Sequence, residues 1–427
     1  MKVTFYTNAM LLLESTETSI LADPWVTFDN TSLSGFYNFP KCGLSKDEVA
    51  AIRPDYIYIS HTHPDHLDPP TLTLFDRSTP ILVADYEHNF TGRAISRLGF
   101  TDVRPVPLND GMKLNGNDHV WLEPAGHTED VDSIGLFRMG GEFAINANDN
   151  SFHEAQCVRL KERAGRIDVA LLPSGAHGPW PMFFENLDAN EKGRAAGQRA
   201  LNLKYTFVRY IDALDPKLVI PIAGGVICGG DKARQYGYSG IRARSEVVEH
   251  AHRNAKPSFE SVLVSEGNIY DTATGKRVGD YVEQTYDTES TYIEELASLP
   301  GIFSPTGVFH IDPSQRIDLT RLLLLARANQ RKWQEIKKTT SDIAFYFDVG
   351  EEMLYRLALG DDTVTRVKES EIPDERYEIF RMPYELLVGL LTRHYVWSNV
   401  NTQNMQFYRH APEMDRDLML VLNFLQI

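Results

Sequence analysis

The sequence predicts an α/β fold followed by a smaller α+β domain. Short apolar runs typical of strands alternate with helical segments over most of the chain, and four such runs end in turn residues followed by His or Asp. From about Asp280 this alternation stops, and a long amphipathic helix is followed by closely spaced strand-like runs. We therefore expect a catalytic domain over residues 1–290 and an α+β domain over residues 291–427.

The N-terminal elements are mostly short strands, predicted over 3–6, 9–14 and 19–22. The third strand ends at Asp23-Pro24, because proline cannot continue a hydrogen-bonded ladder. Ser45 and Glu48 form a capping box, which predicts a helix over 45–52. A strand over 56–59 then leads directly into a histidine-rich segment.

The remaining elements continue the pattern. A helix is predicted to begin at Pro69, and further strands are predicted over 80–84, 102–106, 119–123, 133–138, 143–147, 169–172, 217–223 and 261–264. Helices are predicted over 90–98, 185–213 and 246–254. Residues 283–304 are expected to be a connector, before a helix over 319–338, strands over 343–347, 352–359 and 363–368, and a helix over 384–393.

Composition restricts the class of protein. The formal net charge of -16 argues against broad binding to nucleic acid or to an anionic membrane. The three cysteines are far apart and form no CxxC pair, which fits a reducing cytoplasm. No apolar run is long enough to cross a membrane, and the N-terminal residues are typical of a strand and not of a signal peptide.

The segment His61-Thr62-His63-Pro64-Asp65-His66 is the strongest functional signal. It places three imidazoles and a carboxylate at the end of one predicted strand. Imidazole and carboxylate are the ligands that suit zinc, iron or manganese. The segment therefore predicts a metal site, with Asp23 and Asp68 as outer hydrogen-bond partners of the ligand histidines.

Three later strands also end in candidate ligands, namely His127, Asp149 and His177. His153 follows Asp149 by four residues and is a further candidate. An HxHxDH segment followed by a later His and a later Asp resembles the metallo-β-lactamase superfamily. The resemblance implies a four-layer αββα sandwich with a metal site at one edge of its sheets.

The same resemblance implies a dinuclear site. His61, His63 and His127 would bind the first metal, Asp65 and His66 the second, and Asp149 would bridge them, with Asn146 and Asn148 as its rivals. The superfamily usually adds one more histidine to the second metal, where this chain has Ala223. His177 is the first substitute to consider, and its alternative role is a base or a substrate contact. Asp65 and His177 are therefore the candidate catalytic residues.

The departure at Ala223 indicates a particular branch. The chain resembles the CMP-N-acetylneuraminate hydroxylase family without its Rieske domain, since no CxH…CxxH pattern is present. This resemblance rests on the segments 60–67, 174–176, 220–224, 397–399 and 423–427, on Pro181-Met182, on Asn148-Asp149, and on His127 followed by Glu129 and Asp132. His177 has no counterpart in that family. The branch implies two iron ions, with zinc or manganese as the alternative.

Three classes of function remain. The first is a non-haem diiron monooxygenase that hydroxylates a small substrate, apolar or linked to a nucleotide or coenzyme A, with electrons from an external donor such as a ferredoxin and its reductase. The second is a zinc or manganese hydrolase of lactones, esters or phosphodiesters. The third, a non-catalytic binding protein, is disfavoured because the ligand set is so complete.

Two segments are candidate substrate contacts. Trp180 and Phe183 lie in an apolar loop that would either line a dry reactive centre or fill an ordinary core. Arg242 and Arg244, together with Lys232 and Arg234, would either hold a phosphate or form a solvated face. The oligomeric state is left open by the sequence.

Overall fold

Two large β-sheets form the centre of the N-terminal part of the protein. The computed structural model describes residues 1–32, 35–87, 89–125, 132–151, 153–299, 311–338, 341–360, 362–395, 397, 405–410, 422 and 425–427. In spatial order the first sheet contains β17 (Lys276–Val278), β16 (Ile269–Asp271), β1 (Lys2–Thr7), β2 (Met10–Glu14), β3 (Ser19–Ala22), β5 (Tyr56–Tyr58), β6 (Ile81–Ala84) and β7 (Val103–Val106). The second contains β15 (Glu260–Ser261), β13 (Leu218–Ile222), β12 (Val169–Pro173), β11 (Glu142–Asn146), β10 (Ser133–Met139), β9 (His119–Pro124) and β8 (Met112–Lys113).

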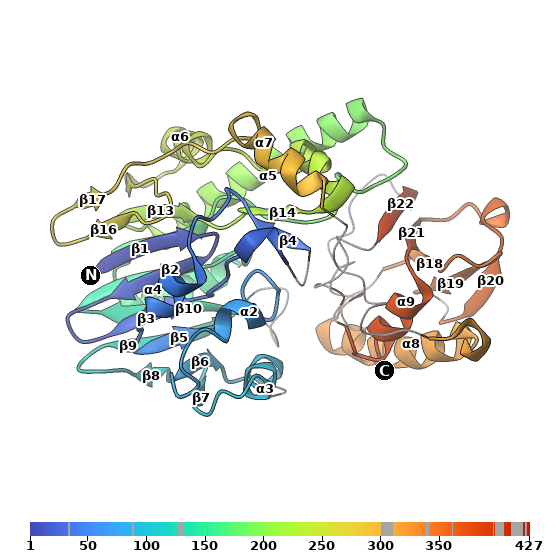
Figure 1. Cartoon of the computed structure of the whole chain (residues 1–427), viewed down its shortest axis with the longest axis horizontal. Coiled ribbons are helices and arrows are strands. Elements are labelled where there is room, and N and C mark those ends of the chain that lie inside the picture. Colours follow the sequence, from blue (N-terminus) through green and yellow to red (C-terminus); the bar gives the residue numbers. More distant parts are fainter. Residues whose placement is uncertain are drawn as a thin grey trace.

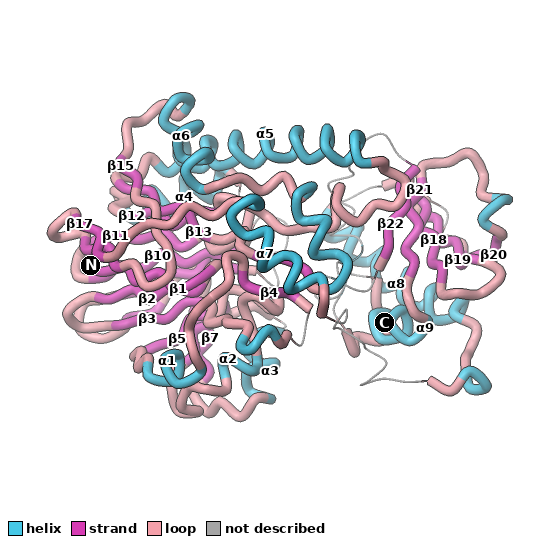
Figure 2. The backbone as a smooth tube through the Cα atoms, turned by 45° about the horizontal axis from the view of Figure 1, so that its top comes forward, coloured by secondary structure: helices cyan, strands magenta, loops and turns pink. Residues whose placement is uncertain are grey.

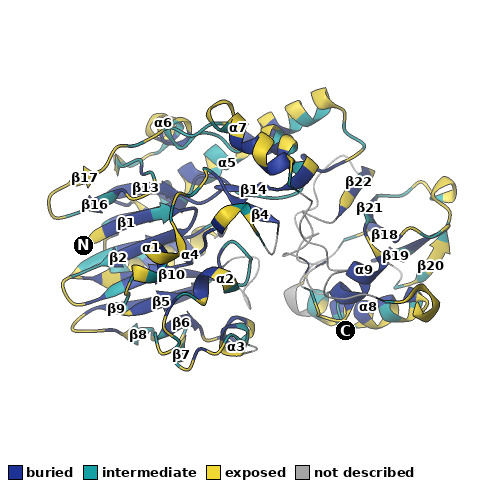
Figure 3. Ribbon diagram, in the orientation of Figure 1, coloured by how far each residue is buried: buried dark blue, intermediate teal, exposed yellow. Residues whose placement is uncertain are grey.

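The two sheets pack face to face, and helices cover both outer faces. Leu11, Tyr58 and Leu82 of the first sheet meet Phe137 and Leu171 of the second in one buried apolar cluster. The first sheet is covered by α1 (Lys46–Ala51), α2 (Pro69–Leu72) and α3 (Phe90–Arg97), and the second by α4 (Glu154–Ala164), α5 (Ala189–Leu214) and α6 (Arg244–Asn254). The predicted αββα sandwich is therefore confirmed (Figures 1 and 3).

The parallel strands of both sheets direct their carboxyl ends to one edge of the sandwich. In the first sheet β3, β5, β6 and β7 run parallel, and in the second β11, β12 and β13 do. Residues that follow these strands are thereby gathered at the same edge, where functional sites are commonly built.

The C-terminal part is a smaller α+β unit, as predicted. Its sheet has the order β20 (Val364–Val367), β19 (Leu354–Ala358), β18 (Ala344–Asp348), β21 (Tyr377–Arg381) and β22 (Gln406–His410). The helices α8 (Leu319–Lys337) and α9 (Tyr384–Leu391) pack on one face of this sheet (Figure 1). Short 3₁₀ turns lie at η1 (Phe28–Asn30), η2 (Gly230–Tyr238), η4 (Pro313–Gln315) and η5 (Glu369–Glu371).

The two parts are joined by a seam in which residues 183–186 pair with β22. Phe184 forms a parallel bridge with Phe407, and the Glu185 N–H donates to the Phe407 carbonyl at 2.8 Å. The Asn186 side chain continues the pairing. It donates to the Arg409 carbonyl (2.8 Å) and accepts from the Arg409 N–H (3.1 Å). An apolar cluster fills this seam and includes Phe184 and Phe407. A small ribbon of β4 (Phe36–Asn38) and β14 (Val226–Cys228) packs into this cluster of the seam.

Several predicted boundaries differ from the structure. The helix expected from residue 185 begins at Ala189, because Asp188 caps it in a box with Glu191 and the preceding residues pair with β22. Residues 283–304 are not a connector throughout, since α7 (Tyr286–Ala297) begins there after the Thr285 cap. The strand expected over 261–264 is the shorter β15. The helix α4 and the strands β4, β8, β14, β16, β17, β21 and β22 were not predicted.

The predicted domain boundary at residue 290 falls inside α7. Tyr292, Ile293 and Leu296 of this helix pack on Tyr37 and Tyr236 of the N-terminal part. Figure 2 shows α7 next to β4 of that part. We therefore propose that the second domain begins after α7. Among the described helices, none has the length and apolarity needed to cross a membrane.

Candidate metal centre

The candidate ligands gather at the edge where the parallel strands end. His61 follows β5 and Asp149 follows β11, so the two sheets each contribute one side of the site. The structure brings ligand-type atoms of His61, His63 and Asp149 to within 4.8 Å of one another. It does the same for Asp65, His66 and Asp149. The two groups share Asp149, which is the arrangement expected of a carboxylate between two cations.

The shared oxygen is Oδ1 of Asp149. It lies 3.3 Å from Nε2 of His66 and 3.6 Å from Nε2 of His61. The neighbouring Asp65 places its Oδ2 atom 3.4 Å from the same His66 nitrogen. Nε2 of His66 therefore faces both carboxylates, whereas Nε2 of His61 faces Asp149 and lies 2.7 Å from Nδ1 of His63.

Asp23 and Ser60 fix the orientation of these two imidazoles. The buried Asp23 carboxylate accepts hydrogen bonds from the Ser60 backbone N–H (2.8 Å) and the Ser60 hydroxyl (2.7 Å), and its Oδ2 lies 2.8 Å from Nδ1 of His66. Since the single hydroxyl proton of Ser60 goes to Asp23, its oxygen must accept from Nδ1 of His61 at 2.9 Å. Both rings then carry their proton on Nδ1 and offer the Nε2 lone pair to the site, as a metal ligand must.

The charges at the site also fit a cation. Burial lowers the pKa of His61 well below its usual value, with His66 and His63 acting in the same direction. Burial also opposes protonation of His66, yet the carboxylates of Asp149, Asp65 and Asp23 raise its pKa well above normal. Three carboxylates thus place negative charge around His66, and a bound metal ion would balance that charge.

Unsatisfied polar atoms give the same indication. Nε2 of His66 and Oδ1 of Asp149 are buried without a hydrogen-bond partner. Such atoms are rare in folded proteins because their desolvation is uncompensated. A metal ion held by the described histidines and aspartates would satisfy both.

The turn after β11 explains why Asp149, and not a neighbouring asparagine, faces the histidines. Asn148 has a positive φ of 46°, and its Oδ1 accepts the backbone N–H groups of Asp149 (3.0 Å) and Asn150 (3.2 Å). Its amide donates to the Ser133 carbonyl at 3.0 Å. Asn146 accepts the Asn148 N–H at 2.9 Å, so both asparagines build the turn that presents Asp149.

Three other predicted residues have different outcomes. His127 lies outside the described residues, so its role as a ligand stays a prediction. His153 is exposed at the start of α4, where the Gln156 side chain accepts its backbone N–H, and it belongs to neither group of ligand atoms. Asp68 caps α2 through Thr71, so its hydrogen bonds in the structure serve the helix and not a ligand histidine.

His177 lies beside the centre but outside both groups of ligand atoms. Its Nε2 is 3.8 Å from Sγ of Cys228, and its ring packs edge-on against Phe36 with a centroid distance of 5.4 Å. Arg199 donates to the carbonyl of the preceding residue, Ala176. In this arrangement His177 contacts the apolar seam, and its roles as ligand and catalytic residue stay predictions.

The environment of His177 predicts an acid-sensitive contribution to stability. Burial, together with the charge of Arg199, lowers the pKa of His177 to about 4. Between this value and the unfolded value of about 6.5, the unfolded chain binds more protons, so stability falls as pH decreases through that window. The comparison uses protein freed of metal with a chelator. Between pH 7 and pH 5, we expect the free energy of unfolding to fall by up to about 2 kcal/mol less in His177→Gln than in the parent. Urea unfolding at the two pH values measures this difference, and equal losses in both proteins would contradict it.

The predicted substrate contacts lie in two places. Trp180 and Phe183 pack in the apolar cluster of the seam, where Arg409 lies 4.6 Å from the Trp180 ring centre and Lys232 lies 4.9 Å from that of Phe183. Arg242 and Arg244 instead line a separate cavity described below.

Two residues of the centre were given no role in the sequence analysis. Ser60 appeared only in the segment 60–67 that carries the family resemblance, although it sets the proton position of His61. Asn8 lies in the turn between β1 and β2 and donates to Oδ2 of Asp65 at 3.2 Å. Its positive φ of 45° is typical of asparagine in a turn, so the residue type alone predicts only that turn.

Comparison with known families agrees with this architecture. The family described as the beta-lactamase superfamily domain matches residues 2–223, slightly more than half of the chain. The chain therefore belongs to the metallo-β-lactamase superfamily.

Particular relatives include both oxidative and hydrolytic proteins. The chain is 35% identical over 238 residues to a putative Rieske 2Fe-2S iron–sulfur protein of Mycolicibacterium smegmatis, covering 52% of this chain and 43% of the relative. It is 27% identical over 243 residues to the cytidine monophosphate-N-acetylneuraminic acid hydroxylase of Danio rerio, covering 52% and 38%, which confirms the expected resemblance. A metal-dependent hydrolase of Pyrobaculum calidifontis is 27% identical over 184 residues, covering 41% and 72%. The chain thus spans less than half the length of the Rieske and hydroxylase relatives.

Solved structures show a distant likeness. CmlA, a diiron beta-hydroxylase from Streptomyces venezuelae, is 19% identical, with a TM-score of 0.44 over 65% of this chain and 53% of that one. An isothiocyanate hydrolase from Delia radicum gut bacteria is 16% identical, with a TM-score of 0.46 over 64% and 99%.

Proposed function

We propose that this protein is a non-haem diiron monooxygenase that hydroxylates a C–H bond of a small substrate. One oxygen atom of O2 would enter the C–H bond, and the other would leave as water with two electrons and two protons from an external donor. The observation that carries the proposal is the make-up of the second ligand group, since the chain has Ala223 where hydrolases of this fold usually have a histidine. The described donors to the first position are His61, His63 and Asp149, and His127 is a further predicted donor there.

The second position supports the same proposal. Its described donors are one imidazole and two carboxylates, from His66, Asp65 and Asp149. Ala223, which follows β13, offers no ligand atom where hydrolases of this fold usually place a histidine. The second metal would therefore have an oxygen-rich set that differs from the hydrolase pattern. Bound iron would supply the capacity to reduce O2. The protein would orient the ligands and limit the access of water to the site.

The residues of the chain have definable roles in such a reaction. Asp23 holds the Nδ1 proton of His66 and, through Ser60, that of His61, so that both Nε2 atoms stay aimed at the centre. Asn8 donates to Asp65 and orients its carboxylate. The apolar cluster beside His177, which includes Phe36 and Phe183, would limit the access of water to one side of the site.

The electron donor and the compartment belong to the same proposal. The relatives include Rieske iron–sulfur proteins and a hydroxylase, which supports an electron-transfer partner such as a ferredoxin with its reductase. Cys42, Cys157 and Cys228 form no disulfide, which supports the reducing cytoplasm as the compartment.

A dinuclear zinc or manganese hydrolase is the second candidate. It is favoured by the metal-dependent hydrolase of Pyrobaculum calidifontis, which the chain matches over 72% of that protein's length. Histidine and carboxylate ligands serve zinc and manganese as well as iron, so the donor types alone do not separate the two functions.

Metal analysis of the purified full chain separates the two candidates. We expect about two iron ions per chain, with an absorption band that changes on reduction and on exposure to O2. An oxygen electrode should then register O2 uptake when a chemical reductant is added. Stoichiometric zinc, with esterase or lactonase activity and no O2 uptake, would contradict the oxygenase and support the hydrolase.

A further inference from the structure

A cavity of about 270 Å³ adjoins the metal centre on the side of Ala223. Asn8 lies in the wall between them, because it lines the cavity while its Nδ2 donates to Asp65 at 3.2 Å. Its Oδ1 accepts the Gly225 N–H at 3.2 Å, which fixes the side chain in that wall. A ligand in the cavity is therefore one side chain away from a candidate metal ligand.

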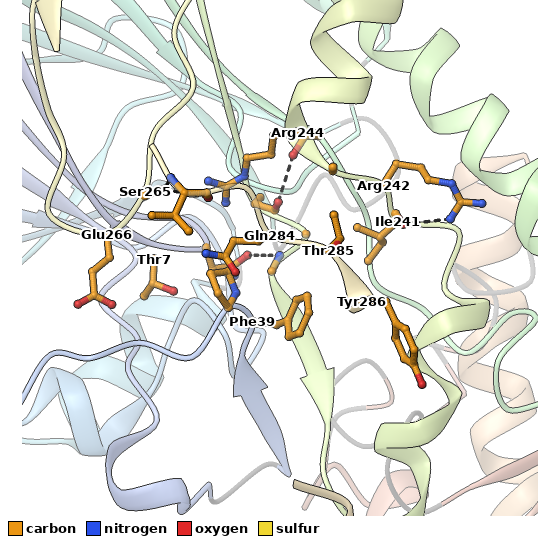
Figure 4. Close-up of a pocket in the computed structure, with 18 of the residues that line it drawn as sticks. Thr7, Phe39, Ile241, Arg242, Arg244, Ser265, Glu266, Gln284, Thr285 and Tyr286 are labelled. Carbon is orange, nitrogen blue, oxygen red and sulfur yellow. Dashed lines mark hydrogen bonds between the residues drawn. The ribbon is translucent and has the colours of Figure 1, made fainter. Parts of the chain in front are cut away.

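The cavity is lined by aromatic rings and by one inward arginine. Phe5, Phe39 and Tyr286 contribute rings to its wall. In Figure 4 Arg244 lies above Gln284 and Phe39, whereas the Arg242 side chain runs away from this group. The Arg244 guanidinium packs over the ring of Phe5, with 4.7 Å to its centre.

Arg244 forms no ion pair with a described acidic residue, although the charge of the nearby Glu283 acts on it. One of its nitrogens, Nη1, donates to the Val264 carbonyl at 3.0 Å, which leaves the rest of the planar donor set available. The Glu283 carboxylate nearby accepts instead from the Tyr281 hydroxyl at 2.8 Å. Burial lowers the pKa of Arg244, as expected when desolvation is not offset by a bonded carboxylate.

Most of the other charged side chains that line the cavity have partners. Glu246 pairs with Lys204, Lys41 pairs with Glu295 at 3.2 Å, and Glu266 accepts the Gly43 N–H at 2.7 Å. The Asp287 carboxylate also lines the cavity and is exposed to solvent. The Lys232 ammonium donates to the Met405 carbonyl at 2.6 Å, and Arg234 pairs with Glu294 at 2.8 Å. The basic cluster expected from the sequence is thus divided, and Arg244 is the member that faces the cavity.

The start of α6 adds to the positive character of this wall. Arg244 is the first residue of the helix, and the capping residue Ala243 has no side chain that can accept the first-turn N–H groups. Uncapped amides at a helix N-terminus favour a negative charge nearby.

We propose that this cavity binds a small organic anion, with its carboxylate or phosphate on Arg244 and an apolar or ring-shaped body against the aromatic wall. The volume lies just below the range of about 300–1,000 Å³ typical of drug-sized ligand pockets, so a whole nucleotide or coenzyme A would not be enclosed. If the proposed metal function holds, this anion is the acidic end of the substrate, bound one side chain, Asn8, away from the candidate ligand Asp65.

Calorimetric titration of the full chain with benzoate, phenyl phosphate and neutral benzamide tests the site. The titration is done on metal-free protein, so that its outcome does not depend on the reaction at the centre. We expect at least one of the two anions to bind and benzamide not to bind. The tighter anion identifies the preferred head group. Failure of both anions, or equal binding of benzamide, would overturn the site while leaving the proposed diiron function intact.

Substitution of the arginine locates the binding. Arg244→Gln should lower the affinity for the anion about 10- to 100-fold, because a charge-assisted hydrogen bond is lost. Arg244→Lys should retain part of the affinity, which separates loss of charge from loss of fold. Arg253→Gln, at the other end of α6 where Arg253 pairs with Glu249, is the matched control and should bind as the parent does. Unchanged affinity in Arg244→Gln would contradict the assignment.

Discussion

Replacing Asp149 by alanine is expected to remove both metal ions from the protein. Its carboxylate belongs to both groups of ligand atoms, and its Oδ1 faces His61 and His66 at 3.6 and 3.3 Å. Loss of an outer hydrogen-bond partner alone lowers metal affinity about 10- to 100-fold, so loss of a shared ligand should exceed about 100-fold. Metal content after gel filtration, and competition with a chromophoric chelator, measure the effect.

Asp168→Ala is a suitable control for this substitution. Asp168 has a side-chain exposure of 21%, close to the 23% of Asp149, and lies at the opposite end of the same sheet, where it accepts the Phe143 N–H at 3.0 Å. The control should keep its metals. Retention of either metal at parental affinity in Asp149→Ala would refute the bridging role.

Asp23→Asn is expected to disturb two histidines at once. Asparagine tolerates the positive φ of 43° at this position, so the change affects hydrogen bonding and not the backbone. Both oxygens of Asp23 accept hydrogen bonds from Ser60 or His66. In asparagine one of these oxygens becomes an NH2 group, which cannot accept them. The Ser60 hydroxyl would then turn toward Nδ1 of His61, and the proton on that ring would move to Nε2, where the metal should bind.

The expected result of Asp23→Asn is a 10- to 100-fold loss of metal affinity and a loss of about 1–3 kcal/mol in the free energy of unfolding. Metal competition and urea unfolding measure the two effects separately. Asp118→Asn is the matched control, because buried Asp118 accepts the Ser15 hydroxyl and the Gly140 N–H but has no histidine partner. It should lose stability and keep its affinity for metal. An equal loss of affinity in both variants would show that Asp23 acts only through folding.

The sequence predicts the parts of the centre that depend on neighbouring residues. His61 to His66 lie directly after a recognisable strand, so their clustering follows from local structure alone. Asp149 was preferred over Asn146 and Asn148 because a carboxylate suits a bridge between cations better than an amide. In the structure Asp149 belongs to both groups of ligand atoms, and its bridging role stays a prediction.

The sequence could not predict features that depend on distant contacts. The position of His177 is set by Phe36 and Cys228, which lie on the β4–β14 ribbon. The late start of α5 depends on pairing between residues 183–186 and β22, which are more than two hundred positions apart in the chain. The role of Ser60 could not be predicted because it depends on the position of Asp23, which accepts the Ser60 hydroxyl.

The seam between the two parts has a consequence for how such proteins can be recombined. Residues 183–186 belong by sequence to the N-terminal part, yet they hydrogen-bond to the β22 edge of the C-terminal sheet through a bridge at Phe184 and the side chain of Asn186. If the C-terminal part were replaced by that of another protein, residues 183–186 would have to pair with a β22 of different sequence. We therefore expect substitutions in the loop after His177 and in β22 to occur together.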